Sequence, residues 1–153
     1  MDFSKMDQKR LAQELIDFRR ARHRRPESAW TEFLTTSEII GQLEQLGIPY
    51  KMGREIHTSG ERYGVPPDEE LERCMERALD EGASPELVGR MRGGYTGVVG
   101  IIDTGRPGPV TALRFDIDCN DVGECQDSDH FPAREGFASE HPQLMHACGH
   151  DVH

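Results

Sequence analysis

The spacing of apolar residues predicts two helices near the start of the chain. Over residues 5–24, apolar side chains recur three or four positions apart, and Pro26 stands just beyond this stretch. A second apolar stripe covers residues 31–46, and Gly47 suits the position that follows a helix. We therefore expect one helix over 5–24 and another over 31–46.

Three other stretches have the pattern of strands. "IPYKMGREI" (48–56) is short and mixed, whereas 96–103 is a nearly continuous apolar run, typical of a strand that is covered on both faces. Glycine and proline in the next connection favour a tight turn into "VTALRFDID" at 110–118. The sequence thus predicts that the last two strands form a hairpin.

Residues 57–94 are polar and rich in turn residues, and they predict two further helices. Pro67 precedes three acidic residues, as at a helix start, and Gly82 can end that helix. Ser84 and Pro85 suit the cap and the first position of the next helix. An ordinary surface excursion is the alternative, but we favour a helical insert that shapes one wall of a site.

Together these elements predict an α/β fold with two N-terminal helices, a helical insert and about three sheet strands. Residues 119–144 follow the last strand without any periodic pattern. A loop of this length is uncommon as a mere connection, so we expect it to serve a binding site.

Charge and composition limit the possible partners. The 153 residues suit one domain, and their low hydrophobic content of 35% suggests a chain that normally packs against additional polypeptide. The net charge of −10 argues against nucleic acid or an anionic membrane as the main partner. The basic cluster at 19–25 is an exception, which could bind phosphate but is more typical of a solvated or ion-paired helix end.

Targeting signals and cysteine spacing point to the cytoplasm. The polar start "MDFSKMDQKR" does not have a signal-peptide pattern, and no apolar run approaches the length of a membrane span. Cys74, Cys119, Cys125 and Cys148 form no closely spaced pairs. We therefore expect a cytoplasmic protein with reduced thiols.

"ALRFDID" places two carboxylates on one face of its predicted strand. Because strand side chains alternate, Arg114, Asp116 and Asp118 share a face, opposite the apolar residues. Open α/β sheets usually bind ligands beyond the carboxyl ends of their strands. The alternative is an aspartate-rich strand end that makes only turn hydrogen bonds.

"HACGHDVH", at the end of the sequence, is a candidate metal site. Cys148 and His150 flank a glycine, and thiolate and imidazole both suit zinc, while imidazole also accepts manganese. Asp151 could orient a ligating histidine without binding the ion itself. His146 and His153 are weaker candidates, three or four residues away from His150 along the chain.

Three alternatives compete with this metal site. Cys148 could be a nucleophile with a histidine base, although the sequence offers no visible oxyanion site. Cys119, Cys125, Cys148 and His150 could hold a structural zinc ion, although their spacing is irregular for one. The histidines could also lie on the surface without any role.

The motifs resemble those of a known family. The segments that carry the likeness are "FRRARHRRPESAWTEF", "MGREI" with "ERYGVPPDEEL", "GGYTGVVGIIDTGRPGPVTALRFDIDCNDVGECQD", "REGFAS" and "LMHACGHDVH". They resemble the M20 family of metal-dependent amidohydrolases and peptidases, and within it the branch of A-type aminobenzoyl-glutamate hydrolases. The string "HACGHDxH" is highly specific to the amidohydrolase branch.

The resemblance implies a cytoplasmic, oligomeric enzyme that hydrolyses the amide bond of an N-acyl or N-aroyl amino acid, such as p-aminobenzoyl-glutamate. It implies two divalent ions, Mn²⁺ or Zn²⁺, in the complete enzyme. By motif, Cys148, His150 and Asp116 correspond to metal ligands, and Asp118 corresponds to the catalytic acid beside the metal centre.

Departures from the family pattern limit what this chain can do. The glutamate pair, two further ligand histidines and the dimerisation domain of the family have no counterpart here, and Glu135 and Glu140 do not stand in the right motif. "CND" after "DID" replaces the more usual "AL". We therefore expect residues 1–153 to be the N-terminal portion of a catalytic domain, with the insert at 57–94 and without activity alone. A non-catalytic fragment or a metal-binding interaction piece is the alternative.

Overall fold

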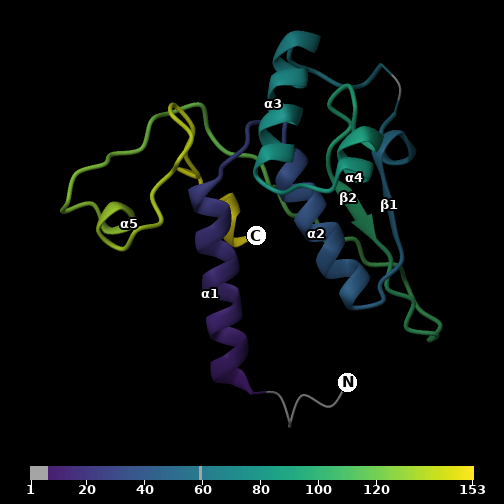
Figure 1. Cartoon of the computed structure of the whole chain (residues 1–153). Helices are drawn as coiled ribbons and strands as arrows, with labels where there is room; N and C mark the ends of the chain where they lie inside the picture. Colours follow the sequence, from purple (N-terminus) through teal and green to yellow (C-terminus); the bar gives the residue numbers. More distant parts are fainter. Residues whose placement is uncertain (1–6, 59) are drawn as a thin grey trace. The chain divides into compact units, whose positions relative to one another are not determined.

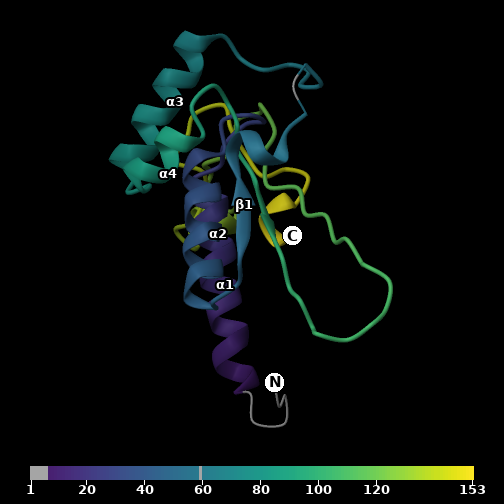
Figure 2. The same ribbon diagram turned by 90° about the vertical axis from the view of Figure 1, so that its right-hand side faces the viewer.

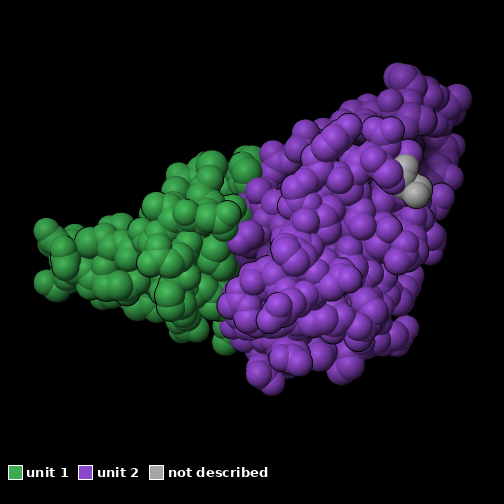
Figure 3. Space-filling model, turned by 90° about the horizontal axis from the view of Figure 1, so that it is seen from above, with its two compact units in different colours: residues 1–26, 119–153 green, residues 27–118 purple. Residues whose placement is uncertain are grey.

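The computed structural model describes residues 7–58 and 60–153, which form two compact units. Unit 1 comprises Met1–Pro26 with Cys119–His153, and unit 2 comprises Glu27–Asp118 (Figure 3). The first two residues of the helix expected at 5–24 lie outside the described residues. The part of the chain that is described contains no helix long and apolar enough to cross a membrane.

Unit 2 is built on three helices that pack on one another (Figure 1). They are α2 (Phe33–Gln45), α3 (Asp68–Asp80) and α4 (Pro85–Arg90). The side chains of the core come mainly from these helices: Phe33, Leu34, Ile40, Met52, Leu71, Cys74, Met75, Ala78, Ala83, Leu87, Val88 and Met91. The segment 57–94 is therefore no surface excursion, because its two predicted helices form and supply much of this core.

Local sequence signals explain where these helices begin and end. The Ser84 side chain caps α4 by accepting from the backbone N–H of Leu87, and Gly82 adopts φ of +102° after α3. The start of α2 is capped from a distance, since the carboxylate of Glu27 accepts from Leu34 N at 3.0 Å and Thr35 N at 2.8 Å. Two N–H groups of the first turn, which have no partner within the helix, are thereby satisfied inside the protein.

The sheet of unit 2 has two antiparallel strands in the described residues. β1 (Tyr50–Met52) pairs with β2 (Val98–Gly100), with Lys51 opposite Val99, and the short 3₁₀ helix η2 (Gly53–Ile56) follows β1 directly. Helices with a small sheet confirm the α/β class.

The predicted hairpin of 96–103 with 110–118 is wrong. β2 pairs with β1 instead, and residues 110–118 are extended loop, which leaves the sheet in a wide excursion (Figure 2). Val110 is 98% exposed and Leu113 76% exposed. A strand needs both a hydrogen-bonding neighbour and cover for its apolar face, and the described chain gives this segment neither.

Unit 1 joins one long helix to the irregular C-terminal segment. α1 (Gln8–Arg24) is capped by Asp7, whose side chain accepts from two N–H groups of the first turn, and η3 (His150–Val152) packs on α1. The single-turn α5 (Phe131–Arg134) interrupts the loop at 119–144, which is otherwise irregular, as predicted.

The basic cluster at 19–25 forms an ion-paired helix end, which confirms the preferred interpretation. Arg19 pairs with Asp151, and Arg24 and Arg25 pair with Glu140. His23, however, is buried, with only 3% exposure, and is not solvated.

Candidate functional site

The candidate ligands Cys148 and His150 lie on one loop of unit 1, separated by a single glycine. Gly149 has φ of +83°, a left-handed conformation that a side chain would strain. This turn ends the loop and starts η3 at His150. Cys148 is exposed and His150 half-buried, so both side chains belong to the accessible part of unit 1.

Asn120 holds this loop by both its backbone and its side chain. Its N–H donates to Met145 O at 3.0 Å, and its C=O accepts from Met145 N at 3.1 Å. Its side-chain Oδ1 accepts from Cys148 N at 3.1 Å and lies 3.0 Å from Cys148 Sγ. Asn120, the middle residue of the unusual "CND" segment, therefore contacts the thiol of Cys148 directly.

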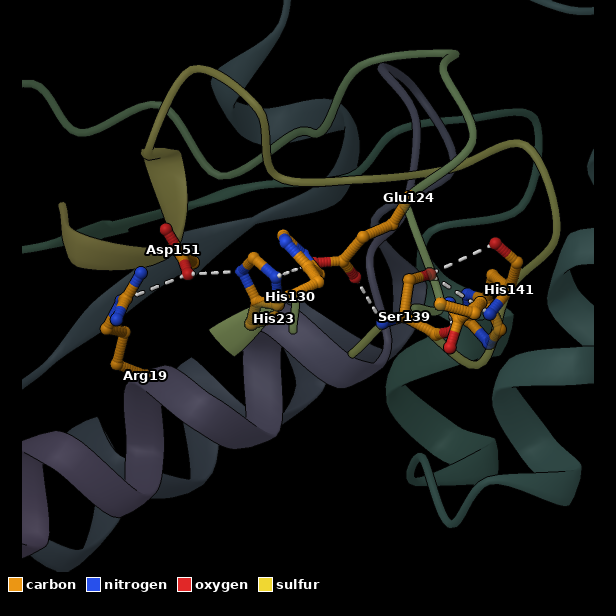
Figure 4. A network of polar contacts seen from close by, with 8 residues as sticks. Arg19, His23, Glu124, His130, Ser139, His141 and Asp151 are labelled. Carbon is orange, nitrogen blue, oxygen red and sulfur yellow. Dashed lines mark hydrogen bonds and ion pairs between the residues drawn. The ribbon is translucent and has the colours of Figure 1, made fainter. Parts of the chain in front are cut away.

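A buried polar network anchors the other end of the loop to α1 (Figure 4). His23 Nδ1 lies 2.9 Å from Asp151 Oδ2, and His23 Nε2 lies 2.9 Å from Glu124 Oε1. Both carboxylate side chains have no exposed surface. Asp151 also receives an ion pair from Arg19 at 3.1 Å.

The same network extends through Glu124. Its Oε1 also contacts His130 Nε2 at 2.9 Å, and its Oε2 accepts from the backbone N–H of Ser139. Ser139 Oγ in turn accepts from His141 N at 3.1 Å. Glu124 thus ties the irregular loop to the end of α1.

The charge states of this network follow from its hydrogen bonds. An ionised carboxylate only accepts hydrogen bonds, so between two ionised carboxylates both ring nitrogens of His23 would donate, as in an imidazolium. The hydrogen bond to Asp151 raises the pKa of His23 above its usual value, against the effect of burial. Burial alone would raise the pKa of Asp151 and Glu124, but the hydrogen bonds and charges around them, those of His23 foremost, outweigh it and the pKa of each is lowered.

One oxygen of the network is left over. Asp151 Oδ1 is buried and has no hydrogen-bond partner among the described residues, although Oδ2 serves both His23 and Arg19. Buried carboxylate oxygens are normally satisfied, and a carboxylate beside a ligating histidine often accepts its second ring N–H. The thiol and the imidazole on this short loop fit the donor set of a divalent transition metal, and the spare oxygen of Asp151 suits a supporting acceptor.

The competing interpretations of the loop fare differently. His153 stacks on His150, with ring centroids 5.1 Å apart, whereas His146 is buried. In the part of the chain described, no three of Cys119, Cys125, Cys148 and His150 gather within ligand distance, which contradicts the structural zinc site. None of the four cysteines, all of which lie among the described residues, forms a disulfide.

Asp116 and Asp118 lie in unit 2, where they line a cavity of about 410 Å³. Arg114 pairs with Asp116 at 2.6 Å, so these two predicted neighbours do lie on one side of the backbone. Because Cys148 and His150 belong to unit 1, their closeness to Asp116 and Asp118 stays a prediction.

The cavity of unit 2 also contains a buried acid that the sequence did not single out. Glu32 is 8% exposed, and its Oε2 accepts from Thr96 Oγ1 at 2.5 Å. Burial is the main cause that raises its pKa to about 7, and the charges of Glu27 and Asp118 raise it further. The neighbouring wall is aromatic, with His57 and Trp30 ring centroids 5.7 Å apart.

Sequence reasoning missed His23, Glu124, Asn120 and Glu32. His23 stands among arginines in the sequence, and such a run of basic residues is typical of an exposed helix end. Glu124 lies in the long irregular loop, whose length was the one available signal. The departure from the family pattern at Asn120 was a second signal, although it did not predict the contact with Cys148.

Comparison with known proteins supports the predicted resemblance. No family model matches the chain. The chain is 46% identical over 143 residues to the A-type subunit of p-aminobenzoyl-glutamate hydrolase from Escherichia coli (strain K12), covering 94% of this chain and 33% of that protein. It is 43% identical to the indole-3-acetyl-aspartic acid hydrolase of Enterobacter agglomerans, covering 95% of this chain and 33% of that protein.

A solved structure agrees with these relatives. The crystal structure of an aminobenzoyl-glutamate utilization protein from Klebsiella pneumoniae matches with a TM-score of 0.71 and 40% identity, over 74% of this chain and 28% of that chain. The resemblance to aminobenzoyl-glutamate hydrolases is confirmed. The chain spans about a third of the length of the curated relatives it matches.

Proposed function

We propose that this chain forms part of a metal-dependent amidohydrolase that cleaves the amide bond of N-acyl or N-aroyl amino acids, with p-aminobenzoyl-glutamate as the model substrate. The observation that carries the proposal is 40–46% identity, over most of the chain, to proteins named as hydrolases or utilization proteins of such amides. The substrate class follows their names, because their substrates share an amide to an acidic amino acid.

Cys148 and His150 are the proposed ligands from unit 1, and Asp116 is the proposed ligand from unit 2. The accessible thiol and the spare oxygen of Asp151 support the first two. When bound, two divalent ions, Mn²⁺ or Zn²⁺, would supply Lewis-acid polarisation of the amide carbonyl and acidify water. Asp118 is the proposed acid beside the ions, and it lines the same cavity as Asp116.

The complete enzyme is proposed to be cytoplasmic and oligomeric, with residues 57–94 as an insert of its catalytic domain. The 153 residues alone are proposed to be inactive. A catalytic zinc-type site needs about three protein ligands per ion and a general base, and the motifs here supply fewer.

A chimera tests this function. This chain would replace the matching third of the Escherichia coli relative, and hydrolysis of p-aminobenzoyl-glutamate and hippurate would be measured with added Mn²⁺. We expect turnover in the chimera, loss of at least about a hundredfold in its Cys148→Ser form and little change in its Cys125→Ser form, since Cys125 is also exposed but lies outside the proposed ligand set. Equal activity in both serine variants would contradict the role of Cys148, and activity of the isolated chain would contradict its proposed inertness.

A further inference from the structure

His23 occupies an unusual position for a histidine that lies outside the loop of candidate ligands. It projects from the last turn of α1, and both of its ring nitrogens contact carboxylates whose side chains are fully buried (Figure 4). One carboxylate, Asp151, directly follows the candidate ligand His150 in the chain. The other, Glu124, belongs to the long loop that also carries His130.

His23 bridges the two buried carboxylates and thereby fixes one oxygen of Asp151. The contacts of His23 with both carboxylates, together with the ion pair of Arg19 with Asp151, offset part of the cost of burying these polar groups. With Oδ2 fixed by His23 and Arg19, the free Oδ1 keeps a defined direction on η3. A carboxylate held this way can accept the ring N–H of a ligating histidine, which fixes the orientation of that ring.

We propose that His23 is a positioning residue of the Cys148–His150 loop: acting through Asp151, it holds the loop in a metal-binding conformation before any ion arrives. The proposal rests on the metal function proposed above for Cys148 and His150. It extends that function by assigning a role to a residue on α1, far away in the sequence, that binds no ion itself.

The chain offers a matched control for His23. His130 contacts the same oxygen of Glu124 at the same 2.9 Å, but the structure gives it no contact with Asp151. Arg19 is the converse case, since it contacts Asp151 and not Glu124, and its side chain is 41% exposed. Comparing the three side chains separates an effect through Asp151 from an effect on Glu124.

The test is titration of the full chain with Co²⁺, following the sulfur-to-cobalt charge-transfer absorption that a Cys148 thiolate would give. The absorption that is lost in Cys148→Ser is the signal of the thiolate. Circular dichroism, together with resistance of the buried Cys119 thiol to labelling, shows that each variant is folded. We expect His23→Gln to weaken Co²⁺ binding by about tenfold or more, as removal of such supporting partners does, and Arg19→Met to weaken it by about threefold. His130→Gln should change it by less than about twofold, because it leaves Asp151 untouched.

The outcomes separate the two proposals. If the wild-type chain gives no thiolate signal, the metal function of Cys148 fails and the role of His23 fails with it. If the signal is present but His23→Gln and His130→Gln weaken binding equally, only the role of His23 is overturned. If His23→Gln does not fold, Arg19→Met decides, because unchanged Co²⁺ affinity and spectrum in that variant would contradict positioning through Asp151.

Discussion

In unit 2, apolar side chains from three helices fill a common core, whereas unit 1 buries a histidine between two carboxylates. The buried apolar side chains of the described part of unit 1 are those of Pro26, Cys119 and Phe137. Apolar burial is non-directional and indifferent to pH, while the network of unit 1 depends on every partner having the right charge. The candidate ligands Cys148 and His150 therefore belong to the unit whose stability depends on a buried network of charged groups.

The largest effect should come from the core of unit 2. Phe33 is fully buried, so Phe33→Ala should lower the free energy of unfolding of unit 2 by about 3–5 kcal/mol, through lost burial and a new cavity. Urea unfolding followed by the fluorescence of Trp30, which lies in unit 2, measures this. The matched control is Phe115→Ala, at a side chain with 58% exposure, and a comparable loss there would contradict the assignment of the core.

Glu32, a buried acid of unit 2, should make the stability of this unit depend on pH. Its pKa of about 7 lies above the usual 4.5, so the folded protein holds a proton that the unfolded chain releases between these values. Stability is therefore lost as pH rises toward 7. Glu32→Gln should stabilise unit 2 by up to about 3 kcal/mol at pH 8 and have little effect at pH 4.

Glu76→Gln, on the exposed face of α3, is the control for this substitution and should change stability by less than about 0.5 kcal/mol at either pH. Urea unfolding at both pH values gives the comparison. A stabilisation of Glu32→Gln that is the same at pH 4 and pH 8 would show that the ionisation of Glu32 is not its cause.

Unit 1 should respond to pH on both sides of a narrow window. The lowered pKa of Glu124 adds stability above its usual 4.5, which is lost as pH falls through the lowered value. The raised pKa of His23 adds stability below its usual 6.5, which is lost as pH rises through the raised value. Unit 1 should therefore be most stable between about pH 4.5 and 6.5.

Two buried thiols allow the two units to be followed separately. In a Cys125→Ser, Cys148→Ser chain, labelling of Cys119 reports unit 1 and labelling of Cys74 reports unit 2. After correction for the intrinsic reactivity of the thiol, Cys119 protection should peak inside the window. If the protection of Cys119 did not change from about pH 4 to pH 9, the claim that unit 1 depends on its charged network would be contradicted.

The smallest effect on stability should come from the loop at 110–118. Replacing Val110, Leu113 and Phe115 by serine should change the free energy of unfolding by less than about 1 kcal/mol, because all three are exposed. The same change should strongly reduce binding of a hydrophobic dye and self-association. Unchanged dye binding would show that the exposed apolar surface lies elsewhere in the chain.

The sequence alone predicted α1, α2, α3 and α4, because apolar spacing, Ser84, Pro85 and the helix-ending glycines are local signals that a helix satisfies within itself. It also predicted the loop of Cys148 and His150 as a candidate site, since Cys-Gly-His is a local motif. The hairpin at 96–118 failed because a strand is defined by its neighbour, and an apolar run does not say which backbone lies beside it.

Only the tertiary structure decided which strand pairs with β2, which polar residues are buried and what they do there. The partners of His23 stand 101 and 128 positions away in the sequence, and no periodicity links them. Glu27 and Glu32 look like surface acids in a polar stretch until folding buries them and gives one a helix start to cap. Local pattern fixes helices because their hydrogen bonds close within about four residues, whereas buried charges are fixed by partners that only the folded chain brings together.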